Sequence, residues 1–147
     1  MLKVILPALL LLVPLPAFAQ EQLVLVAASD QDTFTIEMDW TTADIGAENT
    51  FEIHFIEPET GKEVEDVIYE FGVMQDDMLL FMRTDQTSNV QRVTFSEEGP
   101  YTILVNNIDG LDENTSFYVQ VTPEFPIAWA LPAAFVALFA LRKKLAG

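Results

Sequence analysis

The sequence predicts an all-β protein, a single antiparallel β-sandwich of seven or eight strands. Apolar and polar residues alternate without a slip from residue 33 to residue 40, and similar alternation returns in later segments. A period of two gives each strand one buried face and one solvent-exposed face. Turn-forming residues separate these segments at short intervals, and no segment of the acidic middle has a helical period.

The expected strands follow one another from residue 22 to residue 122, with their apolar residues facing a common core. The residues expected in that core are Phe34, Ile36, Met38, Trp40, Phe51, Ile53, Phe55, Val67, Tyr69, Phe71, Val73, Val93, Phe95, Tyr101, Ile103, Val105, Phe117, Val119 and Val121. Turns are expected at residues 29–32, 44–49, 58–61, 75–77, 85–89 and 107–114. Residues 78–83 are more continuously apolar, which predicts a central strand.

The charge is strongly segregated along the chain. All 23 acidic residues lie between Gln20 and Pro126, where the only basic residues are Lys62, Arg83 and Arg92, so 23 acids and three bases give this segment a net charge of −20. Such a charge repels nucleic acid, whose binding depends on phosphate neutralisation. It favours solubility, cations and basic partners.

The residue inventory argues against an enzyme. The chain has no cysteine, which excludes disulfides, thiol nucleophiles and cysteine-based zinc sites. His54 is the only histidine and is expected to point outward from a strand, so there is no Ser-His-Asp triad. A pair of catalytic carboxylates must face each other across a cleft, and adjacent acids in short loops rarely do so.

The first 19 residues have the three-part pattern of a secretory signal peptide. Lys3 gives a positive start, residues 4–16 are apolar, and Ala17 and Ala19 supply small residues at positions −3 and −1. We expect cleavage after Ala19. A retained N-terminal membrane helix is the alternative, disfavoured by three prolines and the short apolar length.

The other end of the chain predicts a membrane anchor. Residues 125–141 form 17 consecutive uncharged positions, at the short end of what spans a bilayer. Trp129 stands where an interfacial aromatic is expected, and Arg142, Lys143 and Lys144 mark the cytoplasmic side. The prediction is a single-pass cell-membrane protein with its N-terminal domain outside. A buried core helix is the alternative, but the segment is not amphipathic.

The same tail resembles a known family of sorting signals. Pro123, Glu124, Phe125 and Pro126 precede the proline-interrupted apolar run and the closing basic cluster. This layout is similar to archaeal PEF-CTERM-type tails, over residues 123–144. The resemblance implies an archaeal surface protein whose tail is cut by a sortase-like enzyme near residues 123–125 and replaced by another anchor, such as a lipid. Plain membrane anchoring remains the alternative.

A second resemblance concerns residues 95–105, which read Phe-x(3)-Gly-x-Tyr-x-Ile-x-Val. This pattern resembles a hairpin of archaeal and bacterial Ig-like or fibronectin-III-like surface modules, where it precedes the last strand. The resemblance implies an Ig-like sandwich. Trp40 is a candidate for the core tryptophan, whereas the hallmark cysteines of antibody domains are absent.

One acidic loop around Gly110 is a candidate calcium site, because Ca²⁺ takes six to eight oxygen ligands. The spacing is not that of an EF-hand, and a simple turn explains the pattern equally well. The candidate ligands are Asn107, Asp109, Asp112 and Glu113. No other cofactor is expected. The tripeptide that begins at Asn114 is an N-glycosylation acceptor pattern in an exported chain, which predicts a glycoprotein.

The sequence therefore divides into a signal peptide (1–19), an acidic β-sandwich ectodomain (20–122) and an anchor segment (123–147). We expect a non-enzymatic extracellular module with a structural or binding role at the cell envelope, where proteins or glycans are its partners. The alternative is an accessory subunit of a larger membrane complex. The absence of a linker before Pro123 and the alanine-rich apolar run favour that alternative slightly, since small residues permit close helix contact.

Overall fold

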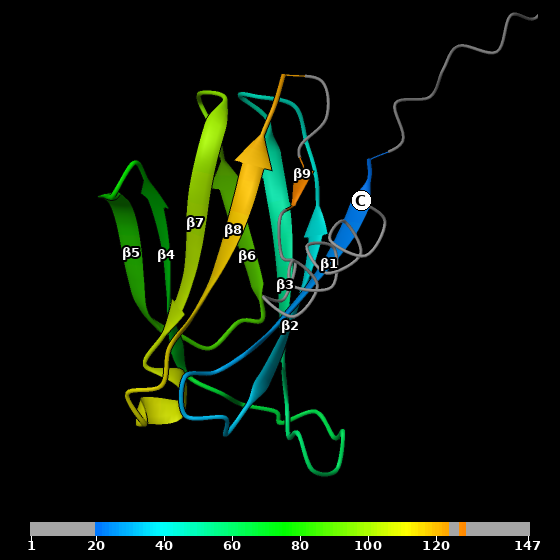
Figure 1. Cartoon of the computed structure of the whole chain (residues 1–147), viewed down its shortest axis with the longest axis vertical. Coiled ribbons are helices and arrows are strands. Elements are labelled where there is room, and N and C mark those ends of the chain that lie inside the picture. Colours follow the sequence, from blue (N-terminus) through cyan, green and yellow to red (C-terminus); the bar gives the residue numbers. More distant parts are fainter. Residues whose placement is uncertain (1–19, 124–126, 129–147) are drawn as a thin grey trace, which may run out of the picture.

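The computed structural model of the protein describes residues 20–123 and 127–128. These residues form two antiparallel β-sheets packed face to face, so the all-β prediction is confirmed (Figure 1). One sheet has four strands in the order β1-β2-β3-β6, and the other has five in the order β5-β4-β7-β8-β9. The elements are β1 (Gln22–Ala28), β2 (Thr35–Thr41), β3 (Glu48–Ile56), β4 (Tyr69–Gln75), β5 (Met78–Gln86), β6 (Val90–Thr94), β7 (Gly99–Asn106), the 3₁₀ turn η1 (Ile108–Gly110), β8 (Thr115–Val121) and β9 (Ile127–Ala128).

A single aromatic-rich core lies between the sheets, and every residue predicted to face it is buried. At its centre, Trp40 and Phe51 are stacked with their ring centroids 5.5 Å apart, and Phe95 meets both rings edge-on. The alternation of the sequence produces this core directly, because every second side chain of a strand points to the same face. Trp40 lies on β2 of the four-stranded sheet.

The strands are connected partly by hairpins and partly by loops that cross between the sheets. Within a sheet, β1 is joined to β2, β2 to β3, β4 to β5 and β7 to β8. The chain crosses from one sheet to the other between β3 and β4, between β5 and β6, and between β6 and β7. The long β3–β4 crossing, residues 57–68, runs over one end of the sandwich (Figure 1).

The predicted hairpin at residues 95–105 is wrong. β6 and β7 do not pair, because β6 joins β3 and β7 joins β4 and β8. The segment is instead a corner that takes the chain across the core, where the Phe95 and Tyr101 rings pack 4.6 Å apart. The Tyr101 hydroxyl donates a 2.8 Å hydrogen bond to the Glu97 carbonyl and so ties the corner to the start of β7.

The prediction of a central strand at residues 78–83 is also wrong. β5 is an edge strand, and its first three residues are strongly exposed: Met78 by 62%, Leu79 by 49% and Leu80 by 45%. A continuous apolar run indicates burial on both faces only if a second strand and a second layer cover it. Here β5 has β4 on one side and no described strand on the other.

The predicted membrane helix is only partly within the described residues. Ile127 and Ala128 belong to it by sequence, but they form β9, which pairs with Val119 and Gln120 of β8. The rest of the predicted helix lies outside the described residues, so a membrane-spanning helix stays a prediction from the sequence. Among residues 20–123 and 127–128, no helix has the length and apolar character needed to cross a bilayer.

The remaining terminal predictions concern positions outside the described residues. These positions are the cleavage-site residues Ala17 and Ala19, the motif residues Glu124, Phe125 and Pro126, and the basic residues Arg142, Lys143 and Lys144. Pro123, the first residue of the motif, is described and lies exposed just after β8.

Candidate functional site

Most of the loops meet at one end of the sandwich, which we call the loop end. It consists of residues 29–34, 57–68, 87–89 and 107–114. Hydrogen bonds join these loops across the sheets: the Asp30 amide donates to the Asn114 carbonyl at 3.0 Å, and the Asp109 amide donates to the Ile68 carbonyl at 2.7 Å. The loop end therefore gathers acidic residues that are far apart in the sequence.

The acids of these loops have a local structural explanation. Among the described residues, every non-glycine residue with a positive φ is aspartate or asparagine, including Asn107, Asp109 and Asp112. Short polar side chains tolerate the left-handed region because they hydrogen-bond locally. Tight turns thus account for several of the acidic positions without any ligand.

The four calcium candidates do not form a cation site in this geometry. Glu113 is only 1% exposed, and its Oε2 accepts a 2.6 Å hydrogen bond from the Ser29 hydroxyl. Asn107 Oδ1 accepts a hydrogen bond from the Asp112 amide at 3.3 Å. No group of three or more histidine, aspartate or glutamate side chains in the described part of the chain is arranged to hold a metal. The side-chain oxygens of Glu113 and Asn107 therefore serve internal hydrogen bonds, and calcium binding stays a prediction from the sequence.

The predicted glycosylation site lies in the same hydrogen-bonded network. Asn114 Oδ1 accepts from the Asn107 amide at 3.1 Å, and Asn114 Nδ2 donates to the Asp112 carbonyl at 3.0 Å and to Asp30 Oδ2 at 3.4 Å. The nitrogen that would carry a glycan is therefore already engaged between two loops. Modification of Asn114 stays a prediction.

A cluster of one imidazole and three carboxylates lies on the outer face of the four-stranded sheet; we call it the His54 cluster. His54 Nδ1 is 2.7 Å from Glu63 Oε1, and His54 Nε2 is 3.6 Å from Glu52 Oε1 and 4.0 Å from Asp39 Oδ2. The outward orientation agrees with the sequence prediction. The partners were not predicted, because the register that sets Asp39 opposite Glu52 is not visible in the sequence.

The carboxylates raise the pKa of His54 above its ordinary value. The hydrogen bond that the ring donates to Glu63 is the largest cause, and the charges of Glu63, Glu52 and Asp39 act in the same direction. Partial burial of the ring acts in the opposite direction but is outweighed.

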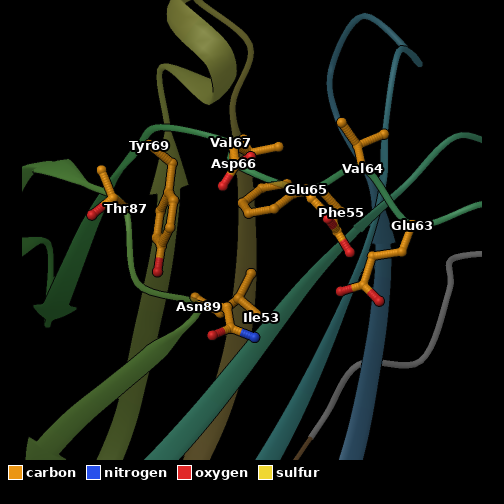
Figure 2. Close-up of a pocket in the computed structure, with 10 residues that line it drawn as sticks. All are labelled: Ile53, Phe55, Glu63, Val64, Glu65, Asp66, Val67, Tyr69, Thr87 and Asn89. Carbon is orange, nitrogen blue, oxygen red and sulfur yellow. The ribbon is translucent and has the colours of Figure 1, made fainter.

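Beside Glu63 lies a pocket of about 260 Å³ at the loop end. Figure 2 shows residues 63–67 along one side of it and Thr87 and Asn89 on the other. Carboxylates of Glu63, Glu65 and Asp66 belong to its lining, and no basic residue does. The lining also includes four buried core residues, Ile53, Phe55, Val67 and Tyr69. Electrostatically, this pocket favours a positively charged group.

The polar groups behind the pocket are paired with one another. The Tyr69 hydroxyl donates to the Ser88 carbonyl at 2.5 Å and accepts from Gln91 Nε2 at 3.0 Å, while Arg83 donates to Gln91 Oε1 at 3.0 Å. Burial raises the pKa of Tyr69 above its ordinary value. The pocket therefore has a wall held by an internal hydrogen-bond network.

Comparison with known proteins adds no relative: no family model, no curated protein and no solved structure matches the chain.

Proposed function

We propose that the chain is an exported, membrane-anchored module whose acidic sandwich faces the cell exterior, where it has a non-enzymatic structural or binding role at the envelope. The observation on which this proposal depends is the coincidence of the folded domain with the acidic segment. Buried core residues run from Leu25 to Val121, whereas the uncharged stretches of the sequence lie before residue 20 and after residue 124. A chain divided in this way has ends suited to lipid and a middle suited to water.

An Ig-like assignment of the sandwich is supported by its corner at Tyr101. In Ig-like folds, a tyrosine near the start of a strand donates its hydroxyl back to a carbonyl a few residues upstream, at the corner where the chain changes sheet. Tyr101 stands at the start of β7, directly after the crossing from β6, and donates to the carbonyl of Glu97. Three crossings between the sheets also fit the Greek-key connections of that class. Such modules commonly serve as surface and adhesion domains.

A binding role is favoured over a purely structural one by the loop end. Its pocket contains three carboxylates and no base in a domain that is acidic throughout. Carboxylates gathered on a low-dielectric wall attract cationic groups and accelerate encounter with basic partners. We therefore propose a basic protein or a cationic envelope component as the partner class.

The intact mass of the protein extracted from membranes tests this proposal. The expected result is recovery in the membrane fraction after a high-salt wash, with a mass that lacks residues 1–19. A further loss from about residue 123 onward would support a PEF-CTERM-type exchange of anchors, and an unaltered C-terminus would support plain anchoring. Recovery of the full 147-residue chain from the cytosol would contradict the proposal.

A second candidate function, accessory subunit of a membrane complex, is favoured by β5. Its exposed Met78, Leu79 and Leu80 lie on a strand edge, and natural proteins normally protect such edges with charge or a covering segment. Purification in mild detergent separates the two candidates. A stoichiometric partner would support the subunit role, and elution of the chain alone would argue against it.

A further inference from the structure

The His54 cluster joins three separate segments of the chain through one side chain. Asp39 lies on β2, His54 and Glu52 lie on β3, and Glu63 lies in the crossing loop between β3 and β4. A fourth acid, Glu37, stands directly opposite His54 in the register of β2 and β3. Every charged group placed against the ring by these segments is thus an acid.

The ring presents a different nitrogen to each side of the cluster. Nδ1 contacts the loop carboxylate of Glu63, whereas Nε2 faces the sheet carboxylates of Glu52 and Asp39. A neutral imidazole has one N–H and one lone pair, so it can donate to one side only and turns its lone pair toward a carboxylate on the other. The imidazolium has an N–H on both sides: Nδ1 hydrogen-bonds to Glu63, and Nε2 lies at ion-pair distances of 3.6 and 4.0 Å from the two sheet carboxylates. The geometry therefore matches the protonated ring.

Asp39 provides a second, independent observation. Its Oδ1 is the one buried side-chain oxygen in the described part of the chain that has no hydrogen-bond partner, and its Oδ2 is 4.0 Å from His54 Nε2. A shielded carboxylate oxygen is costly without a compensating cation. A charge on His54 supplies that compensation.

Glu63 is also the point where the crossing loop is attached to the sheet. Glu63 forms a β-bridge with Ile56, and the next amide, that of Val64, donates a 2.7 Å hydrogen bond to the Phe55 carbonyl. Residues 63–67 then continue along the pocket (Figure 2). The contact between His54 and Glu63 therefore fixes the beginning of one pocket wall.

We propose that His54 is a pH-sensitive latch: the protonated ring holds residues 63–67 against the sheet, and loss of the proton loosens this pocket wall. The latch depends only on the folded domain, so it does not rest on the proposed membrane anchoring. It gives the acidic pocket a closed form in mildly acidic surroundings and a looser form in alkaline ones.

The direction in which pH changes the stability of the latch follows from the raised pKa of His54. A group whose pKa is higher in the folded than in the unfolded state adds stability below its unfolded pKa, about 6.5 for histidine. That contribution is lost as the pH rises through the folded pKa. The many other acids of the domain also alter stability with pH, so the effect of His54 must be isolated by variants.

Proton NMR and hydrogen exchange on the full-length protein test the latch together. Because the chain has one histidine, its ring signals report His54 alone. We expect a pKa above the ordinary value in the parent protein and a lower one in Glu63→Gln. We also expect protection of the Val64 amide, relative to its intrinsic exchange, to fall by about three- to fivefold from pH 5.5 to pH 8.5, the range typical of a partly exposed ion pair.

Two variants decide the outcome. His54→Gln cannot take a proton, so its Val64 protection is expected to stay at the alkaline value of the parent protein over the whole pH range. Arg92→Gln is the matched control, because it removes another ion pair of the same sheet, with Glu48 at 3.3 Å, and leaves the loop untouched.

Two results would overturn the proposal. One is a fall in Val64 protection in His54→Gln equal to that in the parent protein. The other is a pKa of His54 that does not change in Glu63→Gln. Glu63→Gln alters a half-exposed side chain, so this arm does not depend on a buried substitution.

Discussion

Replacing Trp40 by alanine is expected to lower the free energy of unfolding by about 3–5 kcal/mol. The indole is fully buried, stacks on Phe51 and contacts Phe95. Its Nε1 also donates a 3.0 Å hydrogen bond to Asn49 Oδ1, which is itself buried. The substitution therefore creates a large cavity and removes a partner from a buried amide. Urea denaturation followed by circular dichroism measures the change.

Tyr118 provides the control for this experiment. It is 63% exposed on β8, so Tyr118→Ala is expected to change the free energy of unfolding by no more than about 0.5 kcal/mol. If Trp40→Ala cost as little as Tyr118→Ala, the two sheets would not share the core described here.

Replacing Ser29 by alanine is expected to cost about 2–4 kcal/mol, a large effect for the loss of one hydroxyl group. The hydroxyl lies 2.6 Å from Glu113 Oε2 and accepts a hydrogen bond from the Phe34 amide at 3.0 Å. Ser29 and Glu113 are both buried, so the substitution leaves a shielded carboxyl group without this partner. The same denaturation experiment measures the loss.

Two further variants test whether the loss in Ser29→Ala comes from the buried pairing of Ser29 with Glu113. Ser88 is exposed and its hydroxyl bonds only to the backbone of Val90, two residues away, so Ser88→Ala is expected to change stability by about 0.5 kcal/mol or less. Adding Glu113→Leu to Ser29→Ala is expected to recover part of the loss, because the buried carboxyl group that lost its partner is then removed. Equal costs for Ser29→Ala and Ser88→Ala would contradict the buried pairing.

The core was the part of the fold best predicted from sequence. The apolar positions from Phe34 to Trp40 and from Phe117 to Val121 alternate with polar ones, and a strand places alternate residues on one face wherever the strand lies in the sheet. This signal is local, so one sequence is sufficient to read it.

The errors concern relations between strands, which are not local. Residues 78–83 are apolar whether β5 lies inside the sheet or at its edge, and the turn before Gly99 has the same composition whether the chain stays in one sheet or crosses to the other. Pairing partners depend on long-range packing, and local residue patterns do not specify it.

The difference between local and long-range information also explains which features of the candidate site were predicted from sequence. From the sequence, Glu113 was expected to be an acid of a surface loop. In the structure it is buried and contacts Ser29, 84 residues away in sequence. His54 was correctly expected to point outward, but its contacts with Asp39 and Glu63 depend on the register of β2 and β3 and on the path of the crossing loop. The acidic composition predicted a surface rich in carboxylates. It did not predict which carboxylates would contact one another or His54.

Protease treatment of intact cells tests the central claim, that the acidic sandwich faces the exterior while the chain remains attached to the membrane. The protein should be digested, or labelled by an amine reagent at Lys62 in its exposed crossing loop, without lysis of the cells. A cytosolic marker should stay intact in the same sample. Resistance of the protein in whole cells, followed by digestion only after lysis, would contradict the account.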